Sequence, residues 1–353
     1  MKAMPNLGLD WFWRGRLARI ATGWKSWAAG LALIASTAPA ATWYMSPTGS
    51  DSNAGTQASP LATIMGAQSK ASSGDTVDIL AGTYSVPDTI SHTVSPYDIV
   101  NYITKSGITY ASAPTNTTRP VFNFSAINPS GSRVAAFWLP SGTSNVTFRG
   151  FDVVAVQENI TTGNNQSIGM AFWGCTSCTC IVVNVHDADC VGFYLEEVSK
   201  SNLWYRCDSY NNTGINSYSY GNADGLGCHP AAGGVGNILR ECRSWNNSDD
   251  GYDCINSSES VTFDHCWSYL NGNNGGNGNG FKGGGFGCSG GAMPSTIPVH
   301  SVTYCLAALN HGNGGFYANH QPGQAANWLH NTSFDNATDY NMLEGNGNES
   351  TNC

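Results

Sequence analysis

A short phrase that recurs three times in the second half of the chain limits its possible folds more than any other feature. Residues 224–228 read Asp-Gly-Leu-Gly-Cys, residues 250–254 read Asp-Gly-Tyr-Asp-Cys, and residues 279–283 read Asn-Gly-Phe-Lys-Gly. The phrases begin 26 and 29 residues apart. A period of roughly 20–50 residues is typical of solenoids, in which each repeat forms one coil. The sequence therefore predicts an all-β solenoid with Gly- and Asn-rich turns.

Stacking the three phrases as successive coils brings chemically related residues together, because neighbouring strands lie about 4.8 Å apart. This register predicts one column of Asp224, Asp250 and Asn279, and a second column of Gly227, Asp253 and Lys282. Asp249 stands beside the first column. Four acidic residues and one lysine are thus expected to converge on one face.

Cysteine and asparagine repeat with the same coils. The cysteines at this position are Cys207, Cys242, Cys266 and Cys305, and each is followed five residues later by an asparagine. Asn331 and Asn336 continue the spacing without the cysteine. We expect the cysteines to be small, buried core residues and the asparagines to form a ladder of side-chain amides. Cys228 and Cys254 occupy matched positions and are left open as a disulfide pair.

Composition and the N-terminal segment indicate an exported protein. The net charge of −9 argues against a nucleic-acid partner. Basic residues precede an apolar run at residues 27–34 and an Ala-Pro-Ala sequence at residues 38–40, which is typical of a cleaved signal peptide. We therefore expect a signal peptide at residues 1–40 and a secreted protein, extracellular or periplasmic, with no membrane attachment after cleavage.

The remainder, residues 41–353, is expected to form a single monomeric domain. Ser59 and Pro60 resemble the start of a helix, and the apolar residues that follow predict a short capping helix near residues 59–70. Such a cap would cover the first coil of a solenoid. Another coil starts near residues 345–349, so we expect either that the natural chain continues past Cys353 or that a partner covers the open end.

The acidic residues predict a metal site. Asp224, Asp249, Asp250 and Asp253 come from two neighbouring coils and would repel one another without a cation. Oxygen-only ligands suit Ca²⁺, which accepts about 6–8 of them in flexible geometry. The plainer alternative is that they are ordinary acidic turn residues. We expect Ca²⁺ as the cofactor.

Lys282 is predicted to act as a base next to that cation. In the alternation of a strand, Phe281 should point inward and Lys282 outward into the cleft, where the cation would lower its pKa. The C5 hydrogen of a uronate sugar is α to a carboxylate, so its removal leads to β-elimination across C4–C5. The alternative is a structural ion pair between Lys282 and Asp253.

The motifs at residues 222–225 (NADG), 247–253 (NSDDGYD) and 278–287 (GNGFKGGGFG) resemble the polysaccharide lyase family 9 pectate lyases. This resemblance implies a right-handed parallel β-helix acting on acidic pectic polysaccharide such as polygalacturonate. It also implies that the four aspartates hold Ca²⁺ and that Lys282 is the Brønsted base. The family includes rhamnogalacturonan lyases, which leaves the substrate open.

Three arginines, Arg206, Arg240 and Arg243, are further candidates for binding substrate carboxylates; solvated turn residues are an equal alternative. Two other function classes stay open. A polygalacturonase-type glycoside hydrolase also uses paired aspartates, although the signatures expected of that family are missing here. A secreted, non-catalytic β-helix that binds polysaccharide would not need a lysine facing an acidic cluster.

Overall fold

The structure is a computed structural model that describes residues 39–128, 131–158, 160, 165–214, 220–273, 275–284, 298–318, 326–342 and 350–351. Contacts divide the chain into Met1–Pro39 and Ala40–Cys353, and the second unit contains every described strand and helix. The predicted signal peptide lies, up to residue 38, outside the described residues. None of the described helices is long and apolar enough to cross a membrane.

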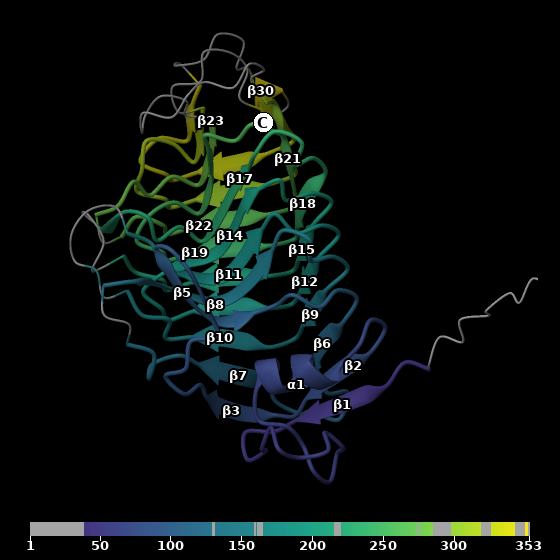
Figure 1. The fold of residues 1–353 in the computed structure, drawn as a ribbon. Helices are drawn as coiled ribbons and strands as arrows, with labels where there is room; N and C mark the ends of the chain where they lie inside the picture. Colours follow the sequence, from purple (N-terminus) through teal and green to yellow (C-terminus); the bar gives the residue numbers. More distant parts are fainter. Residues whose placement is uncertain are drawn as a thin grey trace, which may run out of the picture. The chain divides into compact units, whose positions relative to one another are not determined.

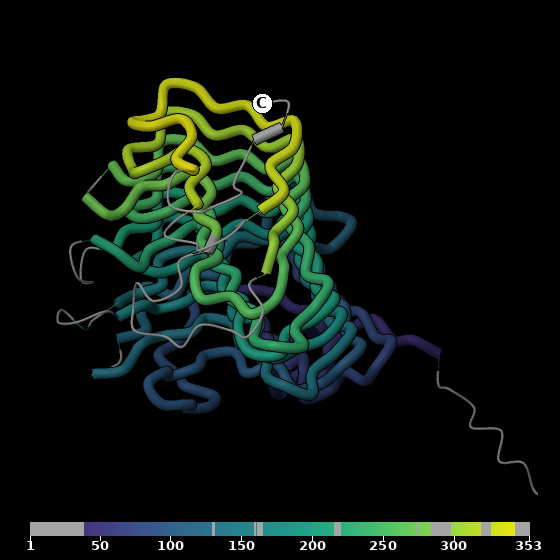
Figure 2. The backbone as a smooth tube through the Cα atoms, turned by 90° about the horizontal axis from the view of Figure 1, so that it is seen from above, coloured from purple at the N-terminus to yellow at the C-terminus, as the bar shows by residue number. Residues whose placement is uncertain are grey.

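The unit from Ala40 onward is a parallel β-helix with three sheets, which confirms the predicted all-β solenoid. From β6 to β29 each coil contributes one strand to sheet 1, then one to sheet 2 and one to sheet 3. Figure 1 shows the strands stacked from the N-terminal coils in purple to the C-terminal coils in yellow, and Figure 2 shows the backbone turns lying one over the next. Within the described residues every strand pairing is parallel except β4 with β5.

The strands of sheet 1 are β1 (Thr42–Met45), β2 (Thr76–Ile79), β6 (Thr109–Ser112), β9 (Thr147–Arg149), β12 (Thr179–Ile181), β15 (Leu203–Tyr205), β18 (Asn237–Arg240), β21 (Val261–Asp264), β24 (His300–Thr303), β27 (Ala326–Leu329) and β30 (Ser350–Thr351). The strands of sheet 2 are β3 (Gly82–Ser85), β7 (Pro120–Asn123), β10 (Asp152–Val154), β13 (Asn184–His186), β16 (Asp208–Tyr210), β19 (Arg243–Trp245), β22 (Trp267–Tyr269), β25 (Leu306–Ala308) and β28 (Thr332–Phe334). The strands of sheet 3 are β4 (His92–Val94), β5 (Tyr97–Tyr102), β8 (Arg133–Pro140), β11 (Ile168–Trp173), β14 (Val191–Glu197), β17 (Leu226–Pro230), β20 (Tyr252–Ile255), β23 (Phe281–Gly284), β26 (Phe316–Tyr317) and β29 (Tyr340–Asn341).

The predicted cysteine and asparagine columns are confirmed. The cysteines of the repeat are buried in one continuous core. The amide of Asn212 donates to Asn247 at 3.0 Å, Asn247 donates to Asn271 at 3.1 Å, and Asn271 donates to Asn310 at 3.1 Å. Asn310 donates to Asn336 at 2.9 Å, so the ladder continues where the spacing placed it. The ten described cysteines are all free thiols, Cys228 and Cys254 included, so these two do not form a disulfide.

The predicted capping helix exists, but it begins later than expected. α1 (Ile64–Lys70) is capped by Thr63, whose hydroxyl accepts a hydrogen bond from the Gly66 amide. The expected cap at Ser59 is wrong because the chain here is still extended: Leu61 forms a bridge with Met45 of β1. The apolar face of α1 packs into the first coils, as a cap requires.

Candidate active site

The predicted columns are present at the edge where sheet 2 turns into sheet 3. Asp249 lies in the turn between β19 and β20, and Asp224 precedes β17. Parallel pairing places Gly227 beside Asp253 and Asp253 beside Lys282. Partners in neighbouring parallel strands direct their side chains to the same side of a sheet, so Asp253 and Lys282 share one face.

The repeated Asp-Gly pair has a packing reason. A Cβ atom on Gly225 would collide with the hydroxyl of Ser244, and one on Gly251 would collide with the hydroxyl of Ser268. Only glycine therefore lets the turn approach the coil beside it. This close approach fixes the position of the aspartate that precedes each glycine.

Three of the four predicted metal ligands converge. One carboxylate oxygen each of Asp224, Asp249 and Asp250 lies within 4.8 Å of the others, and all three residues are at most 5% exposed. Backbone amides hold them in place. Asp249 accepts hydrogen bonds from the amides of Asn222 and Asn277, each at 2.6 Å. These are buried acids aimed at a common point.

Asp250 forms the centre of this group. Its Oδ1 atom accepts from the backbone and side-chain amides of Asn279, both at 2.7 Å, and its own amide donates to Asp224 at 3.1 Å. Asp253 lies outside the group of three: its Oδ1 atom accepts from the Ile255 amide at 2.7 Å, and its Oδ2 atom faces Lys282.

Burial and mutual repulsion disfavour the charged form of these acids. Burial, together with repulsion by Asp249, Asp253 and Asp250, raises the pKa of Asp224 well above its ordinary value. Burial likewise raises the pKa of Asp249 and raises that of Asp250 to about 7, although Lys282 opposes it. One lysine does not compensate the negative charge of several buried carboxylates. Their oxygen atoms form a donor set that fits a hard divalent cation such as Ca²⁺.

Lys282 differs from its prediction in two respects. Its Nζ atom lies 2.9 Å from Oδ2 of Asp250 and 3.0 Å from Oδ2 of Asp253, and only 8% of the side chain is exposed. It therefore packs against the acids instead of extending into open solvent. Burial lowers the pKa of Lys282, but the carboxylates of Asp250 and Asp253 outweigh it and raise the pKa well above its ordinary value.

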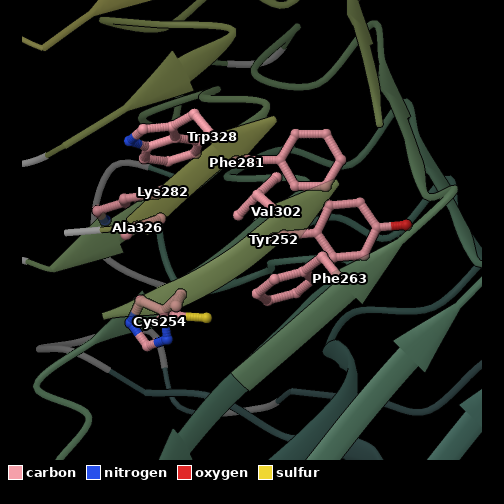
Figure 3. Close-up of a pocket in the computed structure, with 10 residues that line it drawn as sticks. Tyr252, Cys254, Phe263, Phe281, Lys282, Val302, Ala326 and Trp328 are labelled. Carbon is pink, nitrogen blue, oxygen red and sulfur yellow. The ribbon is translucent and has the colours of Figure 1, made fainter. Parts of the chain in front are cut away.

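The inward position of Phe281 is confirmed, since it is part of the core. Figure 3 shows its ring grouped with Tyr252 and Phe263, while Lys282 extends away from them. The cavity among these core residues has a volume of about 10 Å³, room for little more than one water molecule.

The three predicted substrate arginines do not face the acidic cluster. Arg206 pairs with Glu241 at 2.6 Å, Arg240 with Asp264 at 2.8 Å, and Arg243 donates to Asp208 at 2.8 Å. Arg206 and Arg243 line a hollow of about 790 Å³ at the corner between sheets 1 and 2, whose described lining includes none of the acidic cluster. That corner is on a different side of the coil from the acidic cluster, and a role of these arginines in binding substrate carboxylates stays a prediction.

Other residues, which the sequence did not reveal, adjoin the cluster. A cleft of about 220 Å³ is lined by Asp224 and Asp253 together with Tyr194, Glu196 and His229. The Nδ1 atom of His229 lies 2.7 Å from the carbonyl oxygen of Ile255. Burial raises the pKa of Glu196, although His229 lowers it. The signal for His229 was its position directly after the first repeated phrase.

Comparison with known proteins agrees with this geometry. The family model described as "Pel9A-like, right handed beta helix region" matches residues 43–352. Pectate lyase L of Dickeya chrysanthemi is 29% identical over 312 residues, covering 84% of this chain and 66% of the relative. Pectate lyase PEL9 of Emericella nidulans is 30% identical over 337 residues, covering 84% and 74%. The chain thus spans just under two thirds of the length of the Dickeya relative.

Two solved structures share the fold. One is a rhamnogalacturonan lyase, with a TM-score of 0.75 and 36% identity over 84% of this chain and 73% of the other. The other is pectate lyase Pel9A, with a TM-score of 0.68 and 26% identity over 89% and 74%. These matches confirm the predicted right-handed parallel β-helix. The chain belongs to the family of Pel9A-like right-handed β-helix proteins, polysaccharide lyase family 9.

Proposed function

We propose that the chain is a Ca²⁺-dependent lyase that cleaves uronate-containing pectic polysaccharide by β-elimination, with Lys282 as the base. The observation that carries this proposal is the convergence of three buried carboxylates beside a buried lysine at the edge where sheet 2 turns into sheet 3. The family relatives named above are pectate and rhamnogalacturonan lyases, which supports the lyase class over the hydrolase and the non-catalytic alternatives.

Asp224, Asp249 and Asp250 would hold the ion, and Asp253 would join them on releasing Lys282. A bound Ca²⁺ supplies positive charge that compensates these carboxylates and the carboxylate of the substrate, which lowers the energy of the negative charge that develops at C5. The backbone amides that bind Asp249 and Asp250 keep both carboxylates oriented without further rearrangement.

Lys282 can accept a proton only as a neutral amine. Its contacts with Asp250 and Asp253 favour the charged ammonium form instead. Lys282 can therefore act as a base only when another positive charge compensates those two carboxylates. Nζ then takes the C5 proton, the electron pair forms the C4–C5 double bond, and the glycosidic oxygen at C4 leaves and is protonated by solvent. The product carries an unsaturated uronate at its new non-reducing end.

The test is to incubate the protein with polygalacturonate and with rhamnogalacturonan, with and without Ca²⁺, and to follow the ultraviolet absorbance of the unsaturated product. We expect absorbance to rise only with Ca²⁺. New reducing ends without absorbance would indicate hydrolysis, and full activity after exhaustive chelation would show that the aspartates are structural.

Lys282→Arg tests the base itself. Arginine keeps a positive charge beside Asp250 and Asp253, but it stays protonated and cannot accept the proton. We expect kcat to fall by about 10²–10⁴-fold, the range for a general base. An active Lys282→Arg enzyme would remove Lys282 from that role even if elimination were observed.

Secretion and a monomeric state are part of the proposal and are checked by fractionation and by light scattering.

A further inference from the structure

The face of sheet 3 that carries Asp253 continues toward the N-terminal coils as an aromatic surface. Register pairs Tyr102 with Trp138, Trp138 with Ala171, and Ala171 with Tyr194. The rings of Trp138 and Trp173 stack with centroids 4.3 Å apart, and those of Trp173 and Tyr194 lie 6.0 Å apart. Four large aromatic residues therefore lie side by side outside the core of the coil.

A hollow opens on this surface. It has a volume of about 370 Å³ and is lined by Tyr102, Trp138, Pro140, Trp173 and Glu197, with small or aliphatic residues completing it. Tyr102 and Trp173 are partly exposed, while Trp138 is buried beneath them. Concave sites lined by aromatic groups with few polar ones are typical of ligand pockets.

Lining residues of the hollow and of the cleft at the acidic cluster are paired in neighbouring strands of sheet 3. Trp173 pairs with Glu196, and Glu196 pairs with His229; the last two line the cleft next to Asp253. From β11, which carries Trp173, to β20, which carries Asp253, there are three strand steps. At about 4.8 Å a step this is about 14 Å, a distance that an extended polysaccharide of a few residues spans.

The charges in the two places differ. The acidic cleft is suited to a cation and hence to a uronate carboxylate. Among the described residues that line the hollow, the one charged group is the carboxylate of Glu197. A uronate placed there would meet a like charge and no cation, whereas a neutral sugar would present its C–H face to the aromatic rings.

We propose that the hollow formed by Tyr102, Trp138, Trp173 and Glu197 is a subsite for a neutral sugar of the same chain whose uronate lies at Asp253 and Lys282. This inference rests on the proposed function, because it assumes that the substrate lies along the outer face of sheet 3. It implies a preference for polymers in which neutral sugars recur along the backbone or as branches.

The test measures binding separately from catalysis. Calorimetric titrations in the Lys282→Arg background would compare oligogalacturonates with rhamnogalacturonan oligosaccharides of equal length in the presence of Ca²⁺. Trp173→Ala should weaken binding of the neutral-sugar oligosaccharide by about tenfold, a typical effect for an aromatic residue that contacts the ligand, and should change oligogalacturonate binding by no more than about twofold. Trp267→Ala, on the exposed face of sheet 2, is the matched control.

A charge reversal tests the same site by a gain of binding, which misfolding cannot mimic. Glu197→Lys should strengthen oligogalacturonate binding several-fold, and Glu197→Gln should give a smaller gain. Asp335→Lys is the matched control, because Asp335 shares the left-handed backbone, with φ of 55° against 58° for Glu197, but directly follows β28 of sheet 2. The subsite would be overturned if the Trp173 and Glu197 variants changed the binding of both oligosaccharides equally. It would also be overturned if the control variants changed binding as much as they do. Absence of unsaturated product from every polymer would instead refute the proposed function, while the titrations would still decide whether the hollow binds neutral sugar.

Discussion

Removing the ammonium group of Lys282 should destabilise the protein, and Ca²⁺ should reduce that loss. The group contacts two carboxylates whose side chains are 0% and 6% exposed. Removing one partner of a buried ion pair typically costs about 3–5 kcal/mol, because the remaining charge is left uncompensated. In calcium-free buffer we therefore expect Lys282→Met to lower the free energy of unfolding by about that amount.

Calcium offers the same carboxylates a replacement for the lost charge. A ligand at a concentration of about 100 times its Kd stabilises the folded state by about 2.7 kcal/mol. The difference between variant and wild type should therefore narrow in Ca²⁺, since the variant has more uncompensated charge for the ion to neutralise.

Urea titrations followed by tryptophan fluorescence, in chelator and in Ca²⁺, would measure both quantities. Lys200→Met is the control, since Lys200 is exposed and should change stability by no more than about 0.5 kcal/mol. Equal stability of Lys282→Met and wild type in chelator would refute the conclusion that Asp250 and Asp253 are buried charges held by Lys282.

Three further outcomes are expected. Asp224→Asn keeps the shape of a metal ligand but removes its charge, so calorimetry should show Ca²⁺ binding weakened by about tenfold or more, at least 1.4 kcal/mol. Asn247→Ala interrupts the amide ladder: the buried backbone amide of Asn212 loses its acceptor, and Oδ1 of Asn271 keeps the backbone amide of residue 247 but loses the side-chain donor; urea denaturation should show a loss of about 1–3 kcal/mol. Burial lowers the pKa of His300 to about 4 from 6.5, so its contribution to stability is present above pH 6.5 and is lost as the pH falls toward 4, by about 3 kcal/mol in total. Urea midpoints at several pH values would measure that loss, and His300→Asn should make the profile flatter.

The parts of the structure that depend on stacking alone were predictable from the sequence. Once residues 224–228 and 250–254 are placed in register, the columns through Asp253 and Lys282, the inward ring of Phe281 and the asparagine ladder all follow, because a parallel coil repeats its own side-chain pattern. The convergence of three aspartates in the turns follows from the same alignment.

What escaped prediction depends on how turns bend. Strand alternation correctly places Lys282 outside the core, but it does not show that Asp250, carried by a turn, lies against its ammonium group. Stacking also did not reveal where the arginines lie: Arg206 is at the corner between sheets 1 and 2, where Arg206 and Glu241 have left-handed backbone, and its role toward a substrate stays a prediction. The helix began late because Leu61 was already paired with Met45 of β1.

The constant register of sheet 3 also determines how this protein can change its specificity. The residues of the proposed chemistry lie on β20, on β23 and in the turns that precede β17 and β20, whereas the aromatic hollow takes its residues from β5, β8, β11 and β14. Insertion of one complete coil between β14 and β17 would leave both groups of residues intact and would move one relative to the other by a single strand spacing, about 4.8 Å. The hollow would then select a sugar at a different distance from the uronate that is cleaved. Insertion of a whole coil could therefore give the enzyme a new substrate without any change in the catalytic residues.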